Sequence, residues 1–220
     1  MKLAIFDMDG TLVDSLMLWD VFWREFGKRF LNGQAFEPTA EDRNRVKTRT
    51  LRDAMELIHD NYGVGKDVDE LLETVQDIIL KFYENEVELK PGVMEFVEHC
   101  YQKQIPMCLA SATERRVIEL GLKHCQIDRY LPKIFSCVEV GKGKEEPDVF
   151  LAACEYYGVK ANEAWVFEDS LVALKTAKKA GFQTVGVFDK HHDNWAQVKE
   201  VSEVFIDDGE TMMKLIGEHV

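Results

Sequence analysis

Hydrophobic positions recur with two different periods along the chain, and the change of period divides it into two parts. From Pro91 onward, short apolar runs rich in β-branched residues alternate with longer amphipathic stretches. The short runs predict strands at 105–111, 134–140, 164–169, 184–188 and 203–206. Helices are expected in the stretches between them, which read PGVMEFVEHCYQK, ERRVIELGLKHC, PDVFLAACEYYG and SLVALKTAKKAGF. Strands and helices that alternate at this spacing predict parallel βαβ units, and hence a doubly wound α/β sheet.

The stretch from residue 16 to about residue 85 follows only the helical period. Its first apolar residues follow the helical i, i+3, i+4, i+7 spacing, at Leu16, Trp19, Phe22, Trp23, Phe26 and Phe30. The stretches LRDAMELIHDNYG and VDELLETVQDIILKFYENEVE are helical by the same criterion, and no strand is predicted among them. Pro91 and Gly92 mark the point where the α/β pattern resumes. We therefore expect a helical domain of residues 15–89, inserted into an α/β core domain of residues 1–14 and 90–220.

The peptide AIFDMDGTLVDS, residues 4–15, places carboxylates where a buried strand ends. Asp7 ends the first strand and Asp9 follows it, while Glu168 and Asp169 end the strand AWVFED in the same way. Ligands of open α/β sheets bind at the carboxyl ends of the strands, so these acids are expected to converge. Two such charges about 4 Å apart repel by roughly 4 kcal/mol at an effective dielectric near 20. The cluster therefore predicts a bound cation, and ligation by oxygen alone suits Mg²⁺.

Four short motifs occur one after another along the chain. Three of them lie at the ends of predicted strands, and the motif at 143–150 lies in the segment after another predicted strand. They read DMDGT at 7–11, LASAT at 109–113, GKEEPDVF at 143–150 and FEDS at 167–170. In this order they resemble the four motifs of the haloacid dehalogenase superfamily. The helical insert after the first motif is similar to the small α-helical cap of that superfamily. The resemblance covers nearly the whole chain and implies a Rossmann-like core, an inserted helical cap and a phosphatase activity.

The resemblance also implies a role for each residue of the acidic cluster. Asp7 would attack phosphorus and form an aspartyl phosphate, which divides hydrolysis into two displacements. Asp9 would protonate the leaving oxygen and then deprotonate the attacking water. Gly10 would let the backbone turn sharply directly after Asp9. Mg²⁺ would be held by the carboxylates of Asp7 and Asp169 and by the main-chain carbonyl of Asp9, with Glu168 as a ligand or close by.

The remaining motifs imply groups that bind the phosphoryl group. Ser111 would donate a hydrogen bond to its oxygens, and Thr11 and Ala112 are expected to contact it as well. Phosphoryl transfer also requires a cation to balance the negative charge. The family pattern places a lysine three residues before the proline of PD, which selects Lys144. Lys142 is then expected to be an exposed loop charge.

The helical domain contains two candidate substrate contacts, Arg49 and Trp19. Arg49 belongs to a group of five cations within ten residues, formed by Arg43, Arg45, Lys47, Arg49 and Arg52. This group is either a solvated helix face, partly neutralised by neighbouring acids, or a surface that binds the substrate. Trp19 lies in an aromatic stripe of the kind found in helix cores, or it faces the cleft between cap and core.

The substrate expected from this resemblance is a small phosphorylated metabolite, such as a sugar phosphate or a similar phosphomonoester. One alternative is a phosphomutase resembling β-phosphoglucomutase. Such mutases commonly carry valine after the D-x-D-G sequence and histidine in the following helix, where this chain has Thr11 and Trp19. Another alternative is a protein that binds phosphorylated metabolites without catalysis. Retention of every polar motif residue favours an enzyme over that alternative.

Composition excludes several classes of partner. A net charge of −13 repels nucleic-acid phosphates and anionic membranes. No apolar run approaches the length needed to cross a bilayer, and the chain enters a strand directly, so neither a membrane span nor a signal peptide is expected. The five cysteines are widely spread and form no C-x-x-C pair, which favours reduced thiols in a cytoplasmic protein. We expect a monomer or a weak homodimer.

Two further segments have predictable local roles. Asp14 and Ser15 precede a helical run, so Ser15 is expected to be its N-cap. The sequence HHD at 191–193 is expected to be a surface loop, because no adjacent residue completes a tetrahedral metal site.

Overall fold

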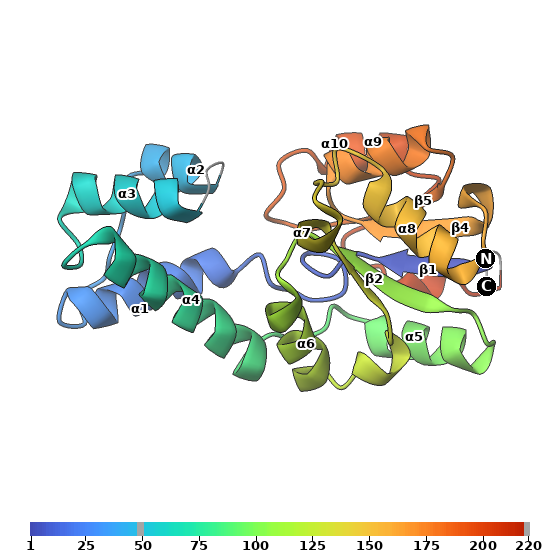
Figure 1. The fold of residues 1–220 in the computed structure, drawn as a ribbon, viewed down its shortest axis with the longest axis horizontal. Helices are drawn as coiled ribbons and strands as arrows, with labels where there is room; N and C mark the ends of the chain where they lie inside the picture. Colours follow the sequence, from blue (N-terminus) through green and yellow to red (C-terminus); the bar gives the residue numbers. More distant parts are fainter. Residues whose placement is uncertain (48–50, 218–220) are drawn as a thin grey trace. The chain divides into compact units, whose positions relative to one another are not determined.

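The computed structural model describes residues 1–47 and 51–217, apart from the side chains of Trp19, Asp20, Asn44 and Lys47. The chain forms two compact units (Figure 1). The larger unit contains Met1–Leu16 and Val87–Val220, and the smaller unit contains Met17–Glu86. The chain thus leaves the larger unit after its first strand and returns to it once.

The larger unit is built on a six-stranded sheet in the order β3-β2-β1-β4-β5-β6. Its strands are β1 (Leu3–Phe6), β2 (Met107–Ser111), β3 (Ile134–Ser136), β4 (Ala164–Glu168), β5 (Gln183–Val187) and β6 (Val204–Ile206). All neighbouring strands are parallel, and Ile5 of β1 is in register with Cys108 of β2 and Val166 of β4. This arrangement confirms the predicted doubly wound α/β fold.

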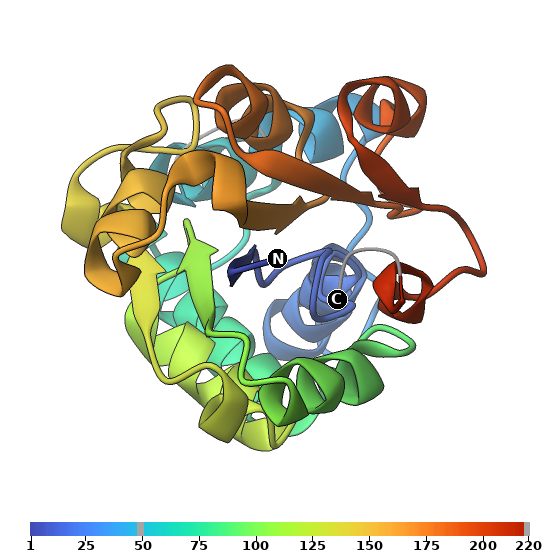
Figure 2. The same cartoon turned by 90° about the vertical axis from the view of Figure 1, so that its right-hand side faces the viewer.

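Helices cover both faces of this sheet (Figure 2). They are α5 (Val93–Gln102), α6 (Arg115–His124), α8 (Asp148–Tyr157), α9 (Leu171–Lys179) and α10 (Trp195–Val201). Alternate residues of β1 point to opposite faces. Ile5 packs into the core formed with α8 and α9, whereas Phe6 packs edge-on against Phe96 of α5, with ring centroids 6.2 Å apart. Both faces of β1 are therefore buried, as its uninterrupted apolar sequence requires.

The strand predicted at 134–140 is wrong in its second half. Strand β3 ends at Ser136, and Cys137–Val140 form a short helix, α7. The Ser136 hydroxyl accepts a hydrogen bond from the Val138 backbone N–H at 3.2 Å, which caps this turn of helix. A short apolar run does not distinguish a strand from a helical turn by its period alone, so this local cap decided the structure.

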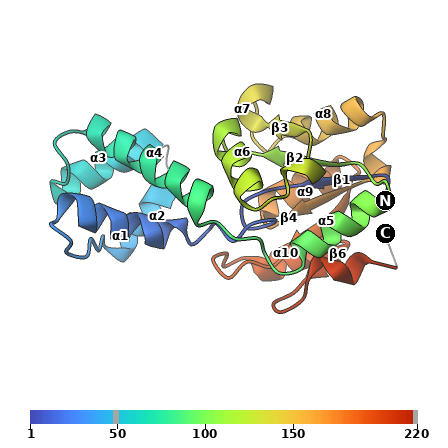
Figure 3. The same cartoon turned by 90° about the horizontal axis from the view of Figure 1, so that it is seen from below.

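The helical character expected of the smaller unit is confirmed. Its described residues contain no strand and form α1 (Leu18–Phe30), α2 (Ala40–Lys47), α3 (Leu51–Tyr62) and α4 (Val68–Asn85). Helix α2 was not predicted, because it has little apolar periodicity. Helix α1 packs on α4, α4 on α3 and α3 on α2 (Figure 3). The core of this unit includes the aromatic rings of Phe22, Trp23, Phe26 and Phe36.

The two connecting segments are hydrogen-bonded to each other within the larger unit. Asp14 N–H donates to the Glu88 carbonyl at 2.9 Å, and Lys90 N–H donates to the Leu12 carbonyl at 2.9 Å. Val13 and Leu89 form an antiparallel bridge between these bonds. The outgoing and returning chains are thereby joined where they leave the sheet. Across the described residues, no helix combines the length and apolarity that a bilayer span requires.

Candidate active site

Three buried carboxylates meet at the carboxyl edge of the sheet. Asp7 follows β1 directly, and its backbone N–H donates to the Phe167 carbonyl of β4 at 2.9 Å. Glu168 ends β4 and Asp169 follows it. Because β1 and β4 are neighbours, carboxylate oxygens of Asp7, Glu168 and Asp169 lie within 4.8 Å of one another. These side chains are almost fully buried, so water does little to screen their charges.

Lys144 inserts its ammonium group among these acids. It lies in the loop before α8, and its Nζ donates to Asp7 Oδ1 and to Glu168 Oε1. The Lys144 side chain is only 12% exposed. Lys142, in contrast, is half exposed and forms an ion pair with Asp148 at 2.9 Å. The structure thus brings Lys144 to the carboxylates and leaves Lys142 on the surface.

The charges in this cluster are strongly coupled. Burial raises the pKa of Asp7 well above its usual value, and the neighbouring Glu168 and Asp169 carboxylates add to the effect against the opposing Lys144 charge. Burial also raises the pKa of Glu168. Burial alone would lower the pKa of Lys144, but the Asp7 and Glu168 carboxylates outweigh it, so this pKa is raised. One ammonium group therefore faces three carboxylates, and the cluster carries excess negative charge when all are ionised.

The three carboxylates have the properties of a site for a hard divalent cation. All side-chain donors are oxygen atoms, they are buried, and they are close enough to share one ion. A bound cation would offset the excess negative charge and favour ionised Asp7. The residues present therefore fit the metal that this donor set implies.

Asp9 is held by two hydroxyl groups. Ser15 Oγ donates to Asp9 Oδ1 at 2.7 Å, and Thr113 Oγ1 donates to Asp9 Oδ2 at 2.6 Å. The prediction that Ser15 caps the following helix is wrong: α1 begins at Leu18, and its N-cap position, Met17, makes no side-chain cap. No role for Thr113 was predicted, although it lies two residues after Ser111 in the motif LASAT. Both hydroxyls instead orient a carboxylate that is distant from Thr113 in sequence.

The expected phosphate-binding residues lie near the same edge, but in different environments. Ser111 ends β2 and is buried, and its Oγ accepts a hydrogen bond from the Thr113 backbone N–H at 3.1 Å. Ala112, which follows it, is exposed. The Thr11 hydroxyl is buried and donates to Asp169 Oδ1 at 3.1 Å. In this structure Thr11 therefore orients a carboxylate of the cluster.

Gly10 occupies a position that no other residue fits. Its φ of +74° lies in the left-handed region, and a Cβ at this position would lie 2.3 Å from Asp169 Oδ2. We expect Gly10→Ala to displace the Asp169 carboxylate and lower the activity of this site by about 10²-fold, since displacements near 1 Å have such effects. Gly209→Ala is the matched control, because Gly209 has a φ of +78° and a Cβ added there would meet nothing within 4 Å. Equal activities of the two variants would contradict the steric argument.

The loop after β5 contains a contact that the sequence did not reveal. His192 Nε2 lies 2.7 Å from Asp169 Oδ2, and this hydrogen bond raises the pKa of His192. His191 Nδ1 lies 3.0 Å from Asp189 Oδ1. Residues 191–193 form a partly exposed loop, as expected, but each histidine also contacts a buried carboxylate. No motif marks the His192 contact, because Asp169 lies 23 residues away in the sequence.

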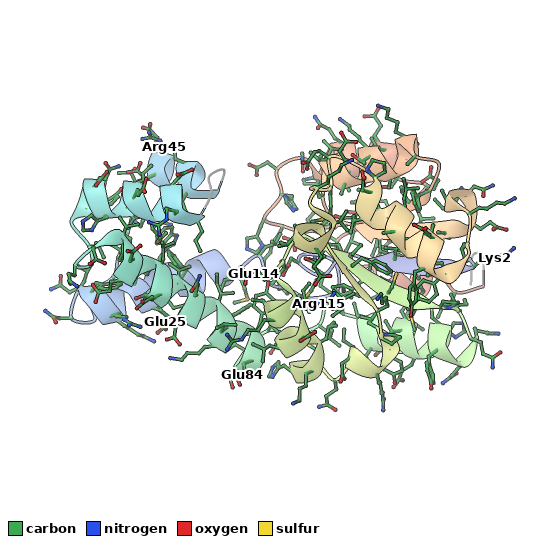
Figure 4. All side chains as sticks on the ribbon, viewed as in Figure 1. Lys2, Glu25, Arg45, Glu84, Glu114 and Arg115 are labelled. Carbon is green, nitrogen blue, oxygen red and sulfur yellow. The ribbon has the colours of Figure 1, made fainter. Side chains whose placement is uncertain are left out.

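Two substrate contacts were predicted in the helical domain, and both fall outside what the structure describes. Arg49 lies outside the described residues, as does the side chain of Trp19. Of the neighbouring cations, Arg45 is exposed on α2 (Figure 4) and forms a 3.6 Å ion pair with Asp42. Arg52 pairs with Asp69 at 2.9 Å. The contacts of Arg45 and Arg52 are typical of a solvated helix face.

Comparison with known proteins gives the family. The model of the haloacid dehalogenase-like hydrolases matches residues 4–187. The chain is 25% identical over 198 residues to the phosphorylated carbohydrates phosphatase of Thermotoga maritima, covering 89% of each protein. It is 27% identical over 200 residues to (DL)-glycerol-3-phosphatase 2 of Arabidopsis thaliana, covering 86% of this chain and 80% of that protein.

Solved structures agree with this assignment at the level of the fold. A Thermotoga maritima protein described provisionally as a β-phosphoglucomutase superposes with a TM-score of 0.82 over 94% of each chain, at 24% identity. CbbY of Rhodobacter sphaeroides in complex with phosphate gives a TM-score of 0.71 over 94% of each chain, at 19% identity. With the match of the family model over most of its length, the chain belongs to the haloacid dehalogenase-like hydrolase family.

Proposed function

We propose that this enzyme is a Mg²⁺-dependent phosphatase that hydrolyses a small phosphorylated metabolite through an aspartyl phosphate on Asp7. The observation that carries the proposal is the buried cluster at the sheet edge, in which Lys144 contacts Asp7 and Glu168 while Asp169 lies beside them. This cluster provides a nucleophile, a cation to balance the phosphoryl charge and oxygen ligands for a metal. These are the components that phosphoryl transfer requires.

In the first step an Asp7 oxygen attacks phosphorus, the bond from phosphorus to the leaving oxygen breaks, and Asp9 gives that oxygen a proton. In the second step Asp9 takes a proton from water, the water oxygen attacks phosphorus, and the bond to Asp7 breaks. Mg²⁺ would be held by Asp7, Asp169 and the main-chain carbonyl of Asp9, with Glu168 beside it, and it would neutralise charge on the phosphoryl group. Throughout, Lys144 restrains Asp7 and offsets the charge of the cluster.

The two hydroxyls on Asp9 suit an acid that must also act as a base. A hydroxyl can donate to an ionised carboxylate and accept from a protonated one. Ser15 and Thr113 can therefore keep Asp9 in one orientation in both protonation states. Their contacts support the proposed double role of Asp9.

Small phosphorylated carbohydrates or polyols are the proposed substrates, with the smaller unit acting as a cap. The relatives named phosphorylated carbohydrates phosphatase and (DL)-glycerol-3-phosphatase 2 support this substrate class. The net charge of −13 repels anions, so the cationic groups at the site must bind the phosphoryl group locally.

We also propose that the enzyme works in the reducing cytoplasm. All five cysteines are free thiols; four of them are buried and Cys125 is partly exposed. Burial raises the pKa of Cys100 to about 12 and that of Cys125 to about 11, which keeps these thiols protonated and unreactive.

Hydrolysis rather than isomerisation is expected when the enzyme is given β-glucose 1-phosphate, a trace of glucose 1,6-bisphosphate and Mg²⁺. A mutase must return the phosphoryl group to the bound sugar and exclude water meanwhile. This chain carries Trp19 where the mutases that it resembles carry histidine, so it lacks that imidazole for proton transfer. Inorganic phosphate should therefore form faster than glucose 6-phosphate.

The same assay, extended to several dozen phosphorylated metabolites, separates the alternatives. Glucose 6-phosphate forming faster than phosphate would identify a mutase. Binding of phosphorylated ligands without turnover of any of them would indicate a non-catalytic binding protein. Release of phosphate from one class of ester would establish the phosphatase and its substrate class together.

A further inference from the structure

Both oxygens of the Asp169 carboxylate accept a hydrogen bond within the protein. Thr11 donates to Oδ1 at 3.1 Å, and His192 lies 2.7 Å from Oδ2. An ionised carboxylate only accepts hydrogen bonds, so the Nε2 atom of His192 carries the hydrogen. With one donor on each oxygen, the carboxylate cannot rotate about its terminal bond without losing a contact.

The loop that presents His192 is tied to the segment where the chain returns to the larger unit. Asp189 is buried, and its Oδ2 lies 2.8 Å from Lys90 Nζ. The same ammonium donates to the Phe188 carbonyl at 2.8 Å. The His192 backbone N–H donates to the Asp189 carbonyl at 3.1 Å. Lys90 and Asp189 therefore determine where the backbone of His192 lies.

On one side this loop borders an open space and not packed side chains. A cavity of about 560 Å³ is lined by Phe188, Asp189 and Lys190, and also by Lys90. A loop beside an open space is not held by a close-packed core. Phe188, at the start of the loop, packs against Leu174, Val198 and Phe205. Beyond Phe188 the polar contacts to Lys90 and to Asp169 hold the loop.

We propose that His192 is a positioning residue that orients Asp169 for binding the metal ion. This inference rests on the proposed function, in which Asp169 is a metal ligand. Carboxylate ligands are themselves held by hydrogen bonds, and loss of such a bond typically weakens metal binding by about 10- to 100-fold. Thr11, which belongs to the first motif, holds Oδ1 of Asp169. His192, which lies in a loop outside all four motifs, holds Oδ2.

The test measures binding of Mn²⁺ alone to the enzyme, by calorimetry or by electron paramagnetic resonance, with no substrate present. We expect His192→Ala to weaken Mn²⁺ binding by about 10- to 100-fold. His192→Gln, which retains an N–H donor on a side chain of similar reach, should recover part of the loss. His124→Ala is the matched control, because His124 is exposed at the end of α6, away from the acidic cluster, and it should bind Mn²⁺ within about threefold of wild type.

A folded His192→Ala variant that binds Mn²⁺ as tightly as wild type would overturn the inference, as would equal losses in the His124 and His192 variants. A wild-type enzyme that binds no Mn²⁺ or Mg²⁺ would instead contradict the proposed function. Lys90→Met is a second variant that leaves His192 in place but removes its tether. It should weaken Mn²⁺ binding in the same direction, and no change would show that the loop is held without Lys90.

Discussion

An Asp7→Asn variant is expected to turn over phosphomonoesters about 10³-fold or more slowly than the wild-type enzyme. The substitution keeps the size of the side chain but replaces the attacking carboxylate with a neutral amide. Lys144 retains Glu168 as a buried partner, so its ammonium group is not left without a counter-charge. We therefore expect the variant to fold, which its thermal unfolding midpoint will show. Turnover is measured as release of inorganic phosphate.

Trapping the intermediate gives this prediction a sharper readout. With p-nitrophenyl phosphate the leaving group needs no proton, so Asp9→Asn should form the aspartyl phosphate but hydrolyse it slowly. When the phosphoryl group of the substrate is labelled, acid quenching should recover labelled Asp9→Asn protein and no labelled Asp7→Asn protein. Labelling of Asp7→Asn, or turnover close to that of wild type, would place the nucleophile at another residue.

Removal of divalent cations is expected to abolish activity, and added Mg²⁺ should restore it. Asp7, Glu168 and Asp169 bring three carboxylates within 4.8 Å, and Lys144 alone does not balance them. A metal typically supplies several kcal/mol of charge stabilisation to the transition state, so the loss in EDTA should be about 10²-fold or more. The measurement is a Mg²⁺ titration of the chelated enzyme. Full activity after exhaustive chelation would exclude a role for the metal.

Calcium provides the control for this experiment. Ca²⁺ has the same charge as Mg²⁺ but accepts more ligands at longer distances and with looser geometry. It should occupy the same carboxylates and misplace the phosphoryl group, so that it inhibits in competition with Mg²⁺. Activation by Ca²⁺ equal to that by Mg²⁺ would show that the site supplies charge without specific geometry.

Several structural features followed from the order of residues alone. The apolar run before Asp7 predicts a strand buried on both faces, and β1 is such a strand. The alternation of strands and helices after Pro91 predicts the doubly wound sheet, and the helical period between residues 16 and 85 predicts α1, α3 and α4 of the smaller unit. These features depend on which side chains must be buried and at what spacing, and that information is local. The family motifs could be found for the same reason, since each lies within a few consecutive residues.

Other features depended on side-chain hydrogen bonds that the apolar pattern does not reveal. Cys137–Val140 formed a helix because the Ser136 hydroxyl capped it, although its apolar residues suit a strand equally well. Ser15 does not cap the helix; its hydroxyl donates to Asp9 instead. Thr113, which follows strand β2, donates to the same carboxylate. A hydroxyl can satisfy its hydrogen bonds with many partners. Only the folded positions of the segments decide which partner it takes.

The acidic cluster shows where the two kinds of information meet. The sequence predicts that Asp7 and Glu168 lie at the ends of buried strands, because each charge directly follows an apolar run. That they face the same ammonium group follows from strand order, since β1 lies next to β4 in the sheet although they are far apart along the chain. The contact between His192 and Asp169 also depends on the folded structure, because it needs the loop after β5 to be tied to Lys90. Burial patterns are set locally, whereas the partners of each polar group are set by the packing of the whole larger unit.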